Sequence, residues 1–322
     1  MSATDARGSN GLIGSVGLVV HHGRRPAVEA GRSLAAWLRG RGVRTRGLPG
    51  EEIGTDDVRA VDEFSDGLDL VVSVGGDGTL LRAAELAQRV DAPLLGVKVG
   101  RVGFLTEVEP AAAVPLLERA LAGEMVIEER MAIVAESAGV LDAAVGSGAA
   151  AATDSAAMSP QWALNEVIVE KRARHRLVTL AASVGEEPVA TFSADGVIVA
   201  TPTGSTAYSF SARGPIVSPS LDCLLLTPVS PHMVFDRSLV LSPHDRVLIE
   251  VMGEEPAILS ADGRTGVELP VGSAVRIGRA ERPARLLRRD RETNFFGLLR
   301  DKFSLPGEAP HGPTRRDVGP GR

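Results

Sequence analysis

The stretch Val74-Gly75-Gly76-Asp77-Gly78-Thr79 follows directly on the apolar run Leu68-Asp69-Leu70-Val71-Val72-Ser73. The two adjacent glycines allow a sharp turn and a close approach of the backbone to a phosphate group. Residues 80–87 then predict a helix, whose N-terminal N–H groups would face an anion. Open α/β sheets bind ligands at this place, the carboxyl end of a strand. The stretch therefore favours an anion or nucleotide site, although an ordinary strand–turn–helix would use the same turn residues.

Strands alternate with helices on both sides of this stretch. Strands are predicted at 13–20, 44–48, 68–74 and 93–97, and helices at 26–39, 80–90 and 111–121. Such alternation is typical of a parallel sheet with right-handed crossovers. We therefore expect residues 13–123 to form an α/β N-terminal domain that binds a nucleotide, with Asp77 on an open loop ahead of its helix.

From residue 124 the pattern changes to short, β-branched segments separated by turn residues. This spacing predicts a C-terminal all-β, sandwich-like domain over residues 124–286. Residues 294–303 predict a short amphipathic helix, and we expect residues 287–305 to return to the first domain. The two ends of the chain, 1–12 and 306–322, are predicted to be disordered because their composition offers little apolar surface to bury.

Composition excludes several classes of protein. With 35 Lys and Arg against 41 Asp and Glu, the net charge of −6 offers no basic surface for nucleic acid. The single cysteine, Cys223, excludes an internal disulfide and a cysteine-rich metal site. The sequence has no secretion signal pattern and no apolar run of the ~18 residues that a membrane helix needs. We expect a soluble cytoplasmic protein that binds neither nucleic acid nor membrane.

Two further groups of residues carry chemical information. The predicted strand that ends at Thr201 leads into a turn rich in Pro, Gly and hydroxyl groups, and Tyr208 is predicted to open a helix. Such a turn suits contact with ribose or phosphate, although a structural turn with a helix cap is the alternative. Asn165 and Glu166 are adjacent polar residues in a strand predicted over 163–170. One of them should point into the core, where either a ligand or an edge or bulge position would satisfy it.

Taken together, Gly75-Gly76-Asp77-Gly78-Thr79, Asn165-Glu166 and the stretch 195–208 resemble the NAD kinase family in their order and spacing. Residues 100–105 are also similar to a glycine-rich loop of that family, and the likeness extends over residues 13–303. The resemblance implies transfer of a phosphoryl group from ATP, or from polyphosphate, to the adenosine-ribose 2′-hydroxyl of NAD. It also implies a homodimer or homotetramer.

The resemblance further implies roles for individual residues. Asp77 would be the catalytic carboxylate, a general base worth ~10²–10⁴-fold in rate. Asn165 and Glu166 would hold the adenosine ribose, and Asp195 would contact the nicotinamide half of NAD. The other residues expected to bind substrate or nucleotide are Gly75, Gly76, Gly78, Thr79, Arg82, Phe104, Thr206, Ala207, Tyr208 and Ser211.

The chain has no Walker-type lysine pattern to bind phosphates. Backbone N–H groups of the glycine loop and arginines such as Arg24, Arg25 or Arg101 are therefore expected to bind them. Mg²⁺ is expected to arrive with ATP and not in a dedicated protein site, because it binds through substrate phosphates and few carboxylates. Two alternatives stay open: a diacylglycerol- or sphingosine-type lipid kinase, which would share the Gly-Gly-Asp-Gly sequence, and a non-catalytic NAD-binding sensor.

Residues 138–160 are dominated by Ala, Gly and Ser, and they predict a flexible insertion. Replacing this segment with a brief Gly/Ser connection should leave the fold intact, because loop-closure entropy changes slowly with length. Thermal unfolding of the shortened protein tests this expectation. Strong hydrogen-exchange protection across the segment in the ligand-free protein would contradict it.

Overall fold

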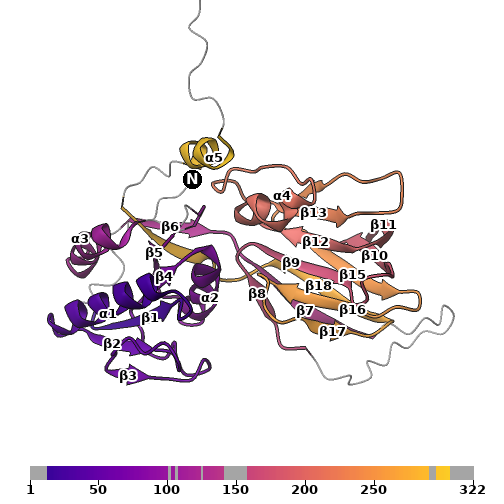
Figure 1. Ribbon diagram of the computed structural model, residues 1–322. Coiled ribbons are helices and arrows are strands. Elements are labelled where there is room, and N and C mark those ends of the chain that lie inside the picture. The colour runs from indigo at the N-terminus through magenta and orange to yellow at the C-terminus, as the bar shows by residue number, and fades with distance from the viewer. Residues whose placement is uncertain are drawn as a thin grey trace, which may run out of the picture. The chain divides into compact units, whose positions relative to one another are not determined.

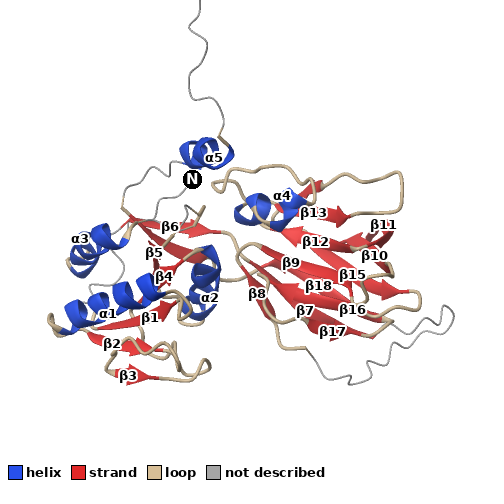
Figure 2. Ribbon diagram, in the orientation of Figure 1, coloured by secondary structure: helices blue, strands red, loops and turns tan. Residues whose placement is uncertain are grey.

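The computed structural model describes residues 13–100, 103–105, 108–124, 126–140, 158–289 and 295–304. The chain divides into two compact units, residues 1–291 and 292–322. The described part of the first unit contains a mixed sheet with helices on it and two antiparallel sheets (Figures 1 and 2). The described part of the second unit contains the helix α5 (Phe295–Phe303), which confirms the helix predicted there. Its return to the first domain stays a prediction.

The mixed sheet has the strand order β3-β2-β1-β4-β5-β19-β6 in the described chain. Its strands are β1 (Ser15–Val20), β2 (Arg44–Gly47), β3 (Asp57–Val58), β4 (Leu70–Gly75), β5 (Leu94–Lys98), β6 (Val126–Arg130) and β19 (Ala284–Arg288). β6 pairs antiparallel with β19, whereas the other pairs in this sheet are parallel. The predicted α/β fold is confirmed. The sheet also contains β6, which lies inside the range 124–286 predicted for the second domain, and β19, which extends across the predicted end of that range at residue 286.

Helices cover both faces of this sheet. They are α1 (Arg25–Arg39), α2 (Asp77–Gln88) and α3 (Pro110–Leu121). Successive side chains of a strand point to opposite faces. In β1, accordingly, Leu18 packs in one apolar cluster with Leu34 of α1 and Leu117 of α3, whereas Val19 packs in another with Leu80 of α2. Burial on both faces explains why β1, β4 and β5 are almost continuous apolar runs.

The strand order reverses beside β1, because β2 pairs with one edge of β1 and β4 with the other. The connections that leave the carboxyl ends of β1 and β4 therefore diverge to opposite faces of the sheet. Such a switch point opens a crevice at the ends of the strands, and open α/β sheets bind ligands there.

The two antiparallel sheets form the sandwich that the sequence predicts. One has the order β11-β10-β15-β18-β7-β8, with β7 (Ile133–Val140), β8 (Gln161–Ala163), β10 (Val178–Val184), β11 (Glu187–Ala194), β15 (Arg246–Met252) and β18 (Ser273–Arg279). The other has the order β14-β13-β12-β9-β16-β17, with β9 (Glu166–Lys171), β12 (Gly196–Ala200), β13 (Leu224–Val229), β14 (Leu239–Leu241), β16 (Ala257–Ala261) and β17 (Val267–Leu269). Their inner faces share one apolar core, which includes Leu180, Val199 and Ile249.

The predicted insertion at 138–160 is described only at its two ends. β7 continues to Val140 and pairs there with β18, so residues 138–140 are strand and not loop. Residues 141–157, like the predicted tails, lie outside the described residues. None of the helices described in the structure has the length and apolar character needed to cross a membrane.

Candidate functional site

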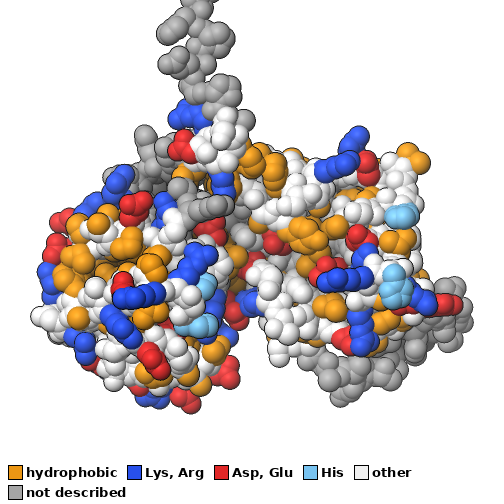
Figure 3. All heavy atoms as spheres, in the orientation of Figure 1, with side chains coloured by type: hydrophobic (Ala, Val, Ile, Leu, Met, Phe, Trp, Pro, Cys, Tyr) orange, Lys and Arg blue, Asp and Glu red, His pale blue; other side chains and the backbone are white. Residues whose placement is uncertain are grey.

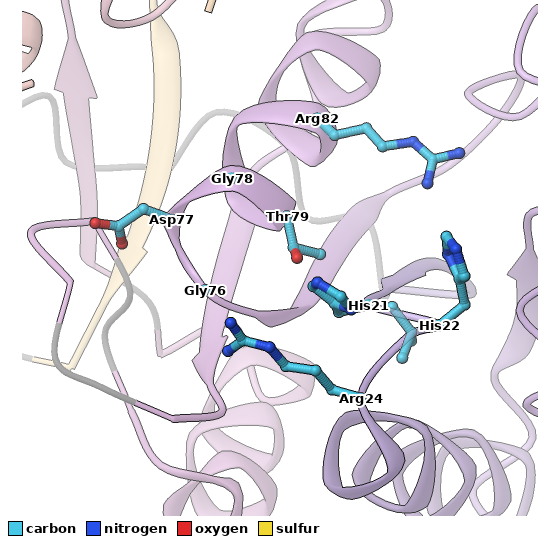
Figure 4. A pocket seen from close by; sticks show the side chains of 9 residues that line it. His21, His22, Arg24, Gly76, Asp77, Gly78, Thr79 and Arg82 are labelled. Carbon is cyan, nitrogen blue, oxygen red and sulfur yellow. The ribbon is translucent and has the colours of Figure 1, made fainter. Parts of the chain in front are cut away.

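A pocket of about 440 Å³ lies at the switch point, where β1 and β4 end (Figure 4). Its lining residues are Val20, His21, His22, Arg24, Gly76, Asp77, Gly78, Thr79 and Arg82. The pocket is thus built from the end of β1 and from the first turns of α2. Five of the residues predicted to bind nucleotide or act in catalysis, Gly76, Asp77, Gly78, Thr79 and Arg82, come together here.

The glycines at the start of α2 leave its backbone accessible. A Cβ atom at Gly76 or Gly78 would meet no atom of the described residues within 4 Å, so a ligand can approach the backbone at both positions. Gly75 is required for a different reason: a Cβ atom at this position would overlap the side chain of Thr79. The N-cap residue, Gly76, has no side-chain capping hydrogen bond for the helix N–H groups. Free N–H groups at a helix N-terminus form a ready site for an anion.

Basic side chains surround this helix end. Arg24 and Arg82 line the pocket, together with His21 and His22, which the sequence reasoning missed. The sequence contains a signal for these histidines, because they directly follow β1, and β1 pairs with β4, the strand that leads into the glycine loop. Of the other arginines considered, Arg25 pairs with Glu29 on the exposed side of α1, and Arg101 lies outside the described residues.

Asp77 is the first residue of α2, so the expectation of an open loop ahead of a helix beginning at residue 80 is wrong. An acidic residue in the first turn suits the helix dipole, which explains the earlier start. The Asp77 carboxylate accepts the backbone N–H of Phe104 at 3.0 Å and that of Leu105 at 3.4 Å. A Cβ at Gly103 would overlap this carboxylate, so the loop can approach only as glycine. In Figure 4 the carboxylate points away from His22 and Arg82.

Asn165 and Glu166 do not lie within a continuous strand, which corrects the strand predicted over 163–170. β8 ends at Ala163 and β9 begins at Glu166, so the chain bends between them. The cause is Asp262, whose carboxylate accepts the N–H groups of Leu164 and Asn165 at 2.8 Å each and of Glu166 at 3.2 Å. These N–H groups bond to the Asp262 side chain in place of a neighbouring strand. From the sequence alone, Asp262-Gly263 is only a weak site candidate, for which a surface loop is the favoured interpretation, although an Asp-Gly pair directly after a strand marks a special turn. The bonds of the Asp262 carboxylate to the bend correct that interpretation.

The pair of side chains at this bend is buried and incompletely bonded. Asn165 Oδ1 and Glu166 Oε2 are buried and have no hydrogen-bond partner among the described residues. Burial, together with the nearby Asp262 carboxylate, raises the pKa of Glu166 to about 8, against a backbone N–H of Tyr208 that lowers it. The pKa of Asp262 is itself raised by burial. Buried polar atoms without partners are rare, and such atoms mark a place for a ligand.

The hydroxyl-rich turn packs directly against this pair. Thr201 Oγ1 donates to the Leu164 carbonyl at 2.6 Å, and a Cβ at Gly204 would overlap the Asn165 backbone carbonyl. The turn continues as a 3₁₀ helix (Thr203–Thr206) and α4 (Tyr208–Ser211), which confirms that Tyr208 opens a helix. The predicted residues Thr206, Ala207, Tyr208 and Ser211 therefore belong to the same turn.

Asp195 lies between β11 and β12, where its carboxylate pairs with Lys171. Burial raises the pKa of Tyr208, and the negative charges of Glu170, Asp195 and Glu166 raise it further, in that order. Tyr208 is thus within electrostatic reach of both Asp195 and Glu166. The structure brings these predicted residues of the β-sandwich together.

Buried charges connect the two groups of site residues. The Leu105 carbonyl, beside the Asp77 contact, accepts a hydrogen bond from Arg288 Nη1 at 3.4 Å. Glu128 bonds to Arg288 at 2.6 Å and to Arg130 at 2.7 Å, and Arg130 donates to Thr203 Oγ1 at 3.3 Å. Burial alone would raise the pKa of Glu128, but the two arginines hold it below its usual value. The loop that fixes Asp77 is therefore linked to the turn that begins at Thr203.

This combination of fold and site defines a class: a nucleotide-binding phosphotransferase with an α/β domain and a β-sandwich. The chain matches the ATP-NAD kinase N-terminal domain over residues 50–125 and the ATP-NAD kinase C-terminal domain over residues 164–289. The NAD kinase of Heliobacterium modesticaldum is 41% identical over 293 residues, which cover 90% of this chain and 98% of the relative. NAD kinase 1 of Streptomyces avermitilis is 37% identical over 314 residues, covering 90% and 87%.

Solved structures agree with these relatives. An NAD kinase from Archaeoglobus fulgidus in complex with ATP superposes with a TM-score of 0.64 at 26% identity, over 91% of this chain and 99% of that one. Yeast NADH kinase complexed with NADH gives a TM-score of 0.80 over 94% and 91%, and its 20% identity shows the fold alone. The chain belongs to the ATP-NAD kinase family, and its activity is that of an NAD kinase, a phosphotransferase with an alcohol group as acceptor. The lipid kinase and sensor alternatives find no support.

The raised pKa of Glu166 leads to a prediction about stability. Because its pKa in the folded protein is about 8 against an ordinary value of 4.5, the folded protein holds a proton between these values that the unfolded chain releases. Stability of the ligand-free wild type should therefore fall as the pH rises through this range. The glutamine of Glu166→Gln cannot titrate. The free energy of unfolding of this variant, relative to that of wild type, should therefore gain ~1–4 kcal/mol from the lower to the upper end of this pH range.

Chemical denaturation of both proteins at about pH 5 and about pH 8.5 measures this gain. The exposed Glu187 offers a matched control, because Glu187→Gln removes the same charge at the surface. A difference between Glu166→Gln and wild type that is equal at both pH values would contradict the prediction.

Proposed function

We propose that Asp77 accepts the proton of the adenosine-ribose 2′-hydroxyl of NAD while this oxygen attacks the terminal phosphorus of ATP. The hydroxyl O–H bond breaks as the new O–P bond forms, and the bond between the γ-phosphorus and the β–γ bridging oxygen breaks. The products are NADP, ADP and a proton on Asp77. The observation that carries the proposal is the fixing of the Asp77 carboxylate at the N-terminus of α2 by the N–H groups of Phe104 and Leu105.

The phosphates of ATP are proposed to occupy the pocket at the switch point. Backbone N–H groups of Gly76 and Gly78 and the guanidinium groups of Arg24 and Arg82 supply hydrogen bonds and positive charge there. Phosphoryl transfer depends mainly on positioning and charge stabilisation, so this arrangement suits the reaction. Polyphosphate presents the same repeating phosphate groups, and it is proposed to serve as an alternative donor.

The acceptor is proposed to bind at the bend between β8 and β9. Asn165 and Glu166 would bond to the adenosine ribose, which the buried and unpartnered Asn165 Oδ1 and Glu166 Oε2 support. Thr206, Ala207, Tyr208 and Ser211 would line the adenosine pocket, with Phe104 close to the same ligand. Asp195 would contact the nicotinamide half.

Mg²⁺ is proposed to enter with ATP. In the described part of the chain, no group of three or more His, Cys, Asp or Glu side chains could hold a metal ion. The proposal rests on the chemistry of Mg²⁺, which binds through substrate phosphates and few protein carboxylates. When bound, Mg²⁺ would offset the negative charge of the phosphates.

The chain is proposed to act in the cytoplasm as a homodimer or homotetramer. Exposed apolar side chains support the assembly: Val234 and Phe235 precede β14, and Val240 lies on that edge strand. Such exposed apolar groups are typical of contact surfaces. The cytoplasmic location follows from the presence of NAD and ATP there.

Asp77→Asn should lower kcat by at least ~10²-fold and leave NAD binding within a few-fold of wild type, because the base is lost while the shape is kept. The assay is formation of NADP from NAD, ATP and Mg²⁺, coupled to an NADP-specific dehydrogenase. Asp62→Asn, at a side chain that is 97% exposed, is the matched control. A kcat within a few-fold of wild type would remove Asp77 from the catalytic role.

Asn165→Ala should weaken NAD binding by ~1–3 kcal/mol, because polar groups of the bound ribose lose their partner. The unfolding temperature without ligand should change little, since Oδ1 makes no hydrogen bond among the described residues. Calorimetric titration with NAD and thermal unfolding measure the two effects. A large loss of stability with unchanged NAD affinity would show a structural role instead.

A further inference from the structure

Glu51 is a buried carboxylate that the proposed reaction does not use. It follows β2 at the carboxyl edge of the sheet, in the connection next to the pocket, and it is 2% exposed. Neither carboxylate oxygen has a hydrogen-bond partner of good geometry among the described residues. Among the described residues it forms an ion pair with Arg82 of α2, with 3.7 Å between Glu51 Oε1 and Arg82 Nη1.

Arg82 is shared between this carboxylate and the pocket. Its side chain is 43% exposed and lines the pocket, whereas Glu51 is enclosed behind it. A distance of 3.7 Å is an ion pair without a short hydrogen bond, so Arg82 can turn toward a stronger anion at modest cost. Losing Arg82 would leave Glu51 as an isolated buried charge, and such groups bind a proton instead.

We propose that Glu51 and the phosphate groups of the bound nucleotide compete for Arg82, so that phosphate binding draws Arg82 to the ligand while Glu51 takes up a proton from the solvent. This inference rests on the proposed function of the pocket. Glu51 then acts as a positioning residue: it orients Arg82 in the free enzyme and becomes neutral when phosphates arrive. Protonation removes a negative charge that would otherwise repel the phosphates.

The charges around Glu51 favour uptake near neutral pH. Burial raises the pKa of Glu51 to about 7, while nearby backbone N–H groups of Val20 and Leu48 and the charge of Arg82 oppose the rise. From α1, Arg32 donates to the backbone carbonyl of the neighbouring Glu52. After β1, His21 and His22 line the pocket. Removing the Arg82 charge and adding phosphates both raise the Glu51 pKa further.

Calorimetric titration with MgATP, without NAD, tests the inference. Titrations in two buffers of different ionisation enthalpy count the protons taken up. At about pH 7.5 the wild type should take up about half a proton more than Glu51→Gln. At about pH 5.5, where Glu51 is protonated beforehand, this difference should vanish. Glu51→Gln should also bind MgATP ~3–10-fold more tightly, because the competing charge is gone.

The exposed neighbour Glu52 provides the matched control, and Glu52→Gln should behave as wild type. If Glu51→Gln takes up as many protons as wild type, or binds MgATP more weakly, the inference is wrong.

The variant Arg82→Met provides an independent test. It should bind MgATP more weakly than wild type and should also lose the proton uptake that depends on Glu51. Unchanged MgATP affinity in Arg82→Met would contradict the proposal that the phosphates of ATP occupy the pocket. A Glu51-dependent uptake seen with NAD and not with MgATP would support the exchange but assign the pocket to the pyrophosphate of NAD.

Discussion

The hydrogen bonds from the N–H groups of Phe104 and Leu105 to Asp77 are the interaction on which the site depends. They fix the first residue of α2 to the loop after β5, so the carboxylate and the helix N-terminus keep one orientation. The Leu105 carbonyl accepts from Arg288, and the buried charges beyond it lead to the turn that begins at Thr203. Asp77, the proposed base, is therefore oriented before any substrate binds, which is the arrangement that preorganised catalysis requires.

Much of the fold follows from local pattern. The strands β1, β2, β4 and β5 are predicted within a few residues. For β1, β4 and β5 the reason is that a parallel sheet covered on both faces leaves apolar runs in the sequence. The site is predicted less completely. The bend at Asn165 depends on Asp262, which is 97 residues away, and the pairing of β6 with β19 likewise joins distant segments. Glu51 gives no sequence signal, because its burial depends on packing and not on pattern.

Two buried carboxylates, Glu51 and Glu166, belong to the proposed ligand sites. Burial raises the pKa of each, to about 7 and about 8 respectively, and each lies beside a group of site residues. Both have oxygen atoms without hydrogen-bond partners in the described chain. Such groups destabilise the free protein, and they persist where a ligand or a proton relieves them. The ligand-free state is thus less stable than its apolar core would allow.

The place of β19 in the mixed sheet has a consequence for biosynthesis. This strand, Ala284–Arg288, lies between β5 and β6, although the whole β-sandwich separates it from them in the chain. On the ribosome the α/β sheet therefore stays incomplete until residue 288 has been made: β6 lacks its partner in the sheet, and β5 lacks its pairing at Leu94. Exposed strand edges invite wrong pairing, and distant contacts form slowly. Translation that stops ahead of residue 284 would leave both groups of proposed site residues synthesised but the mixed sheet incomplete.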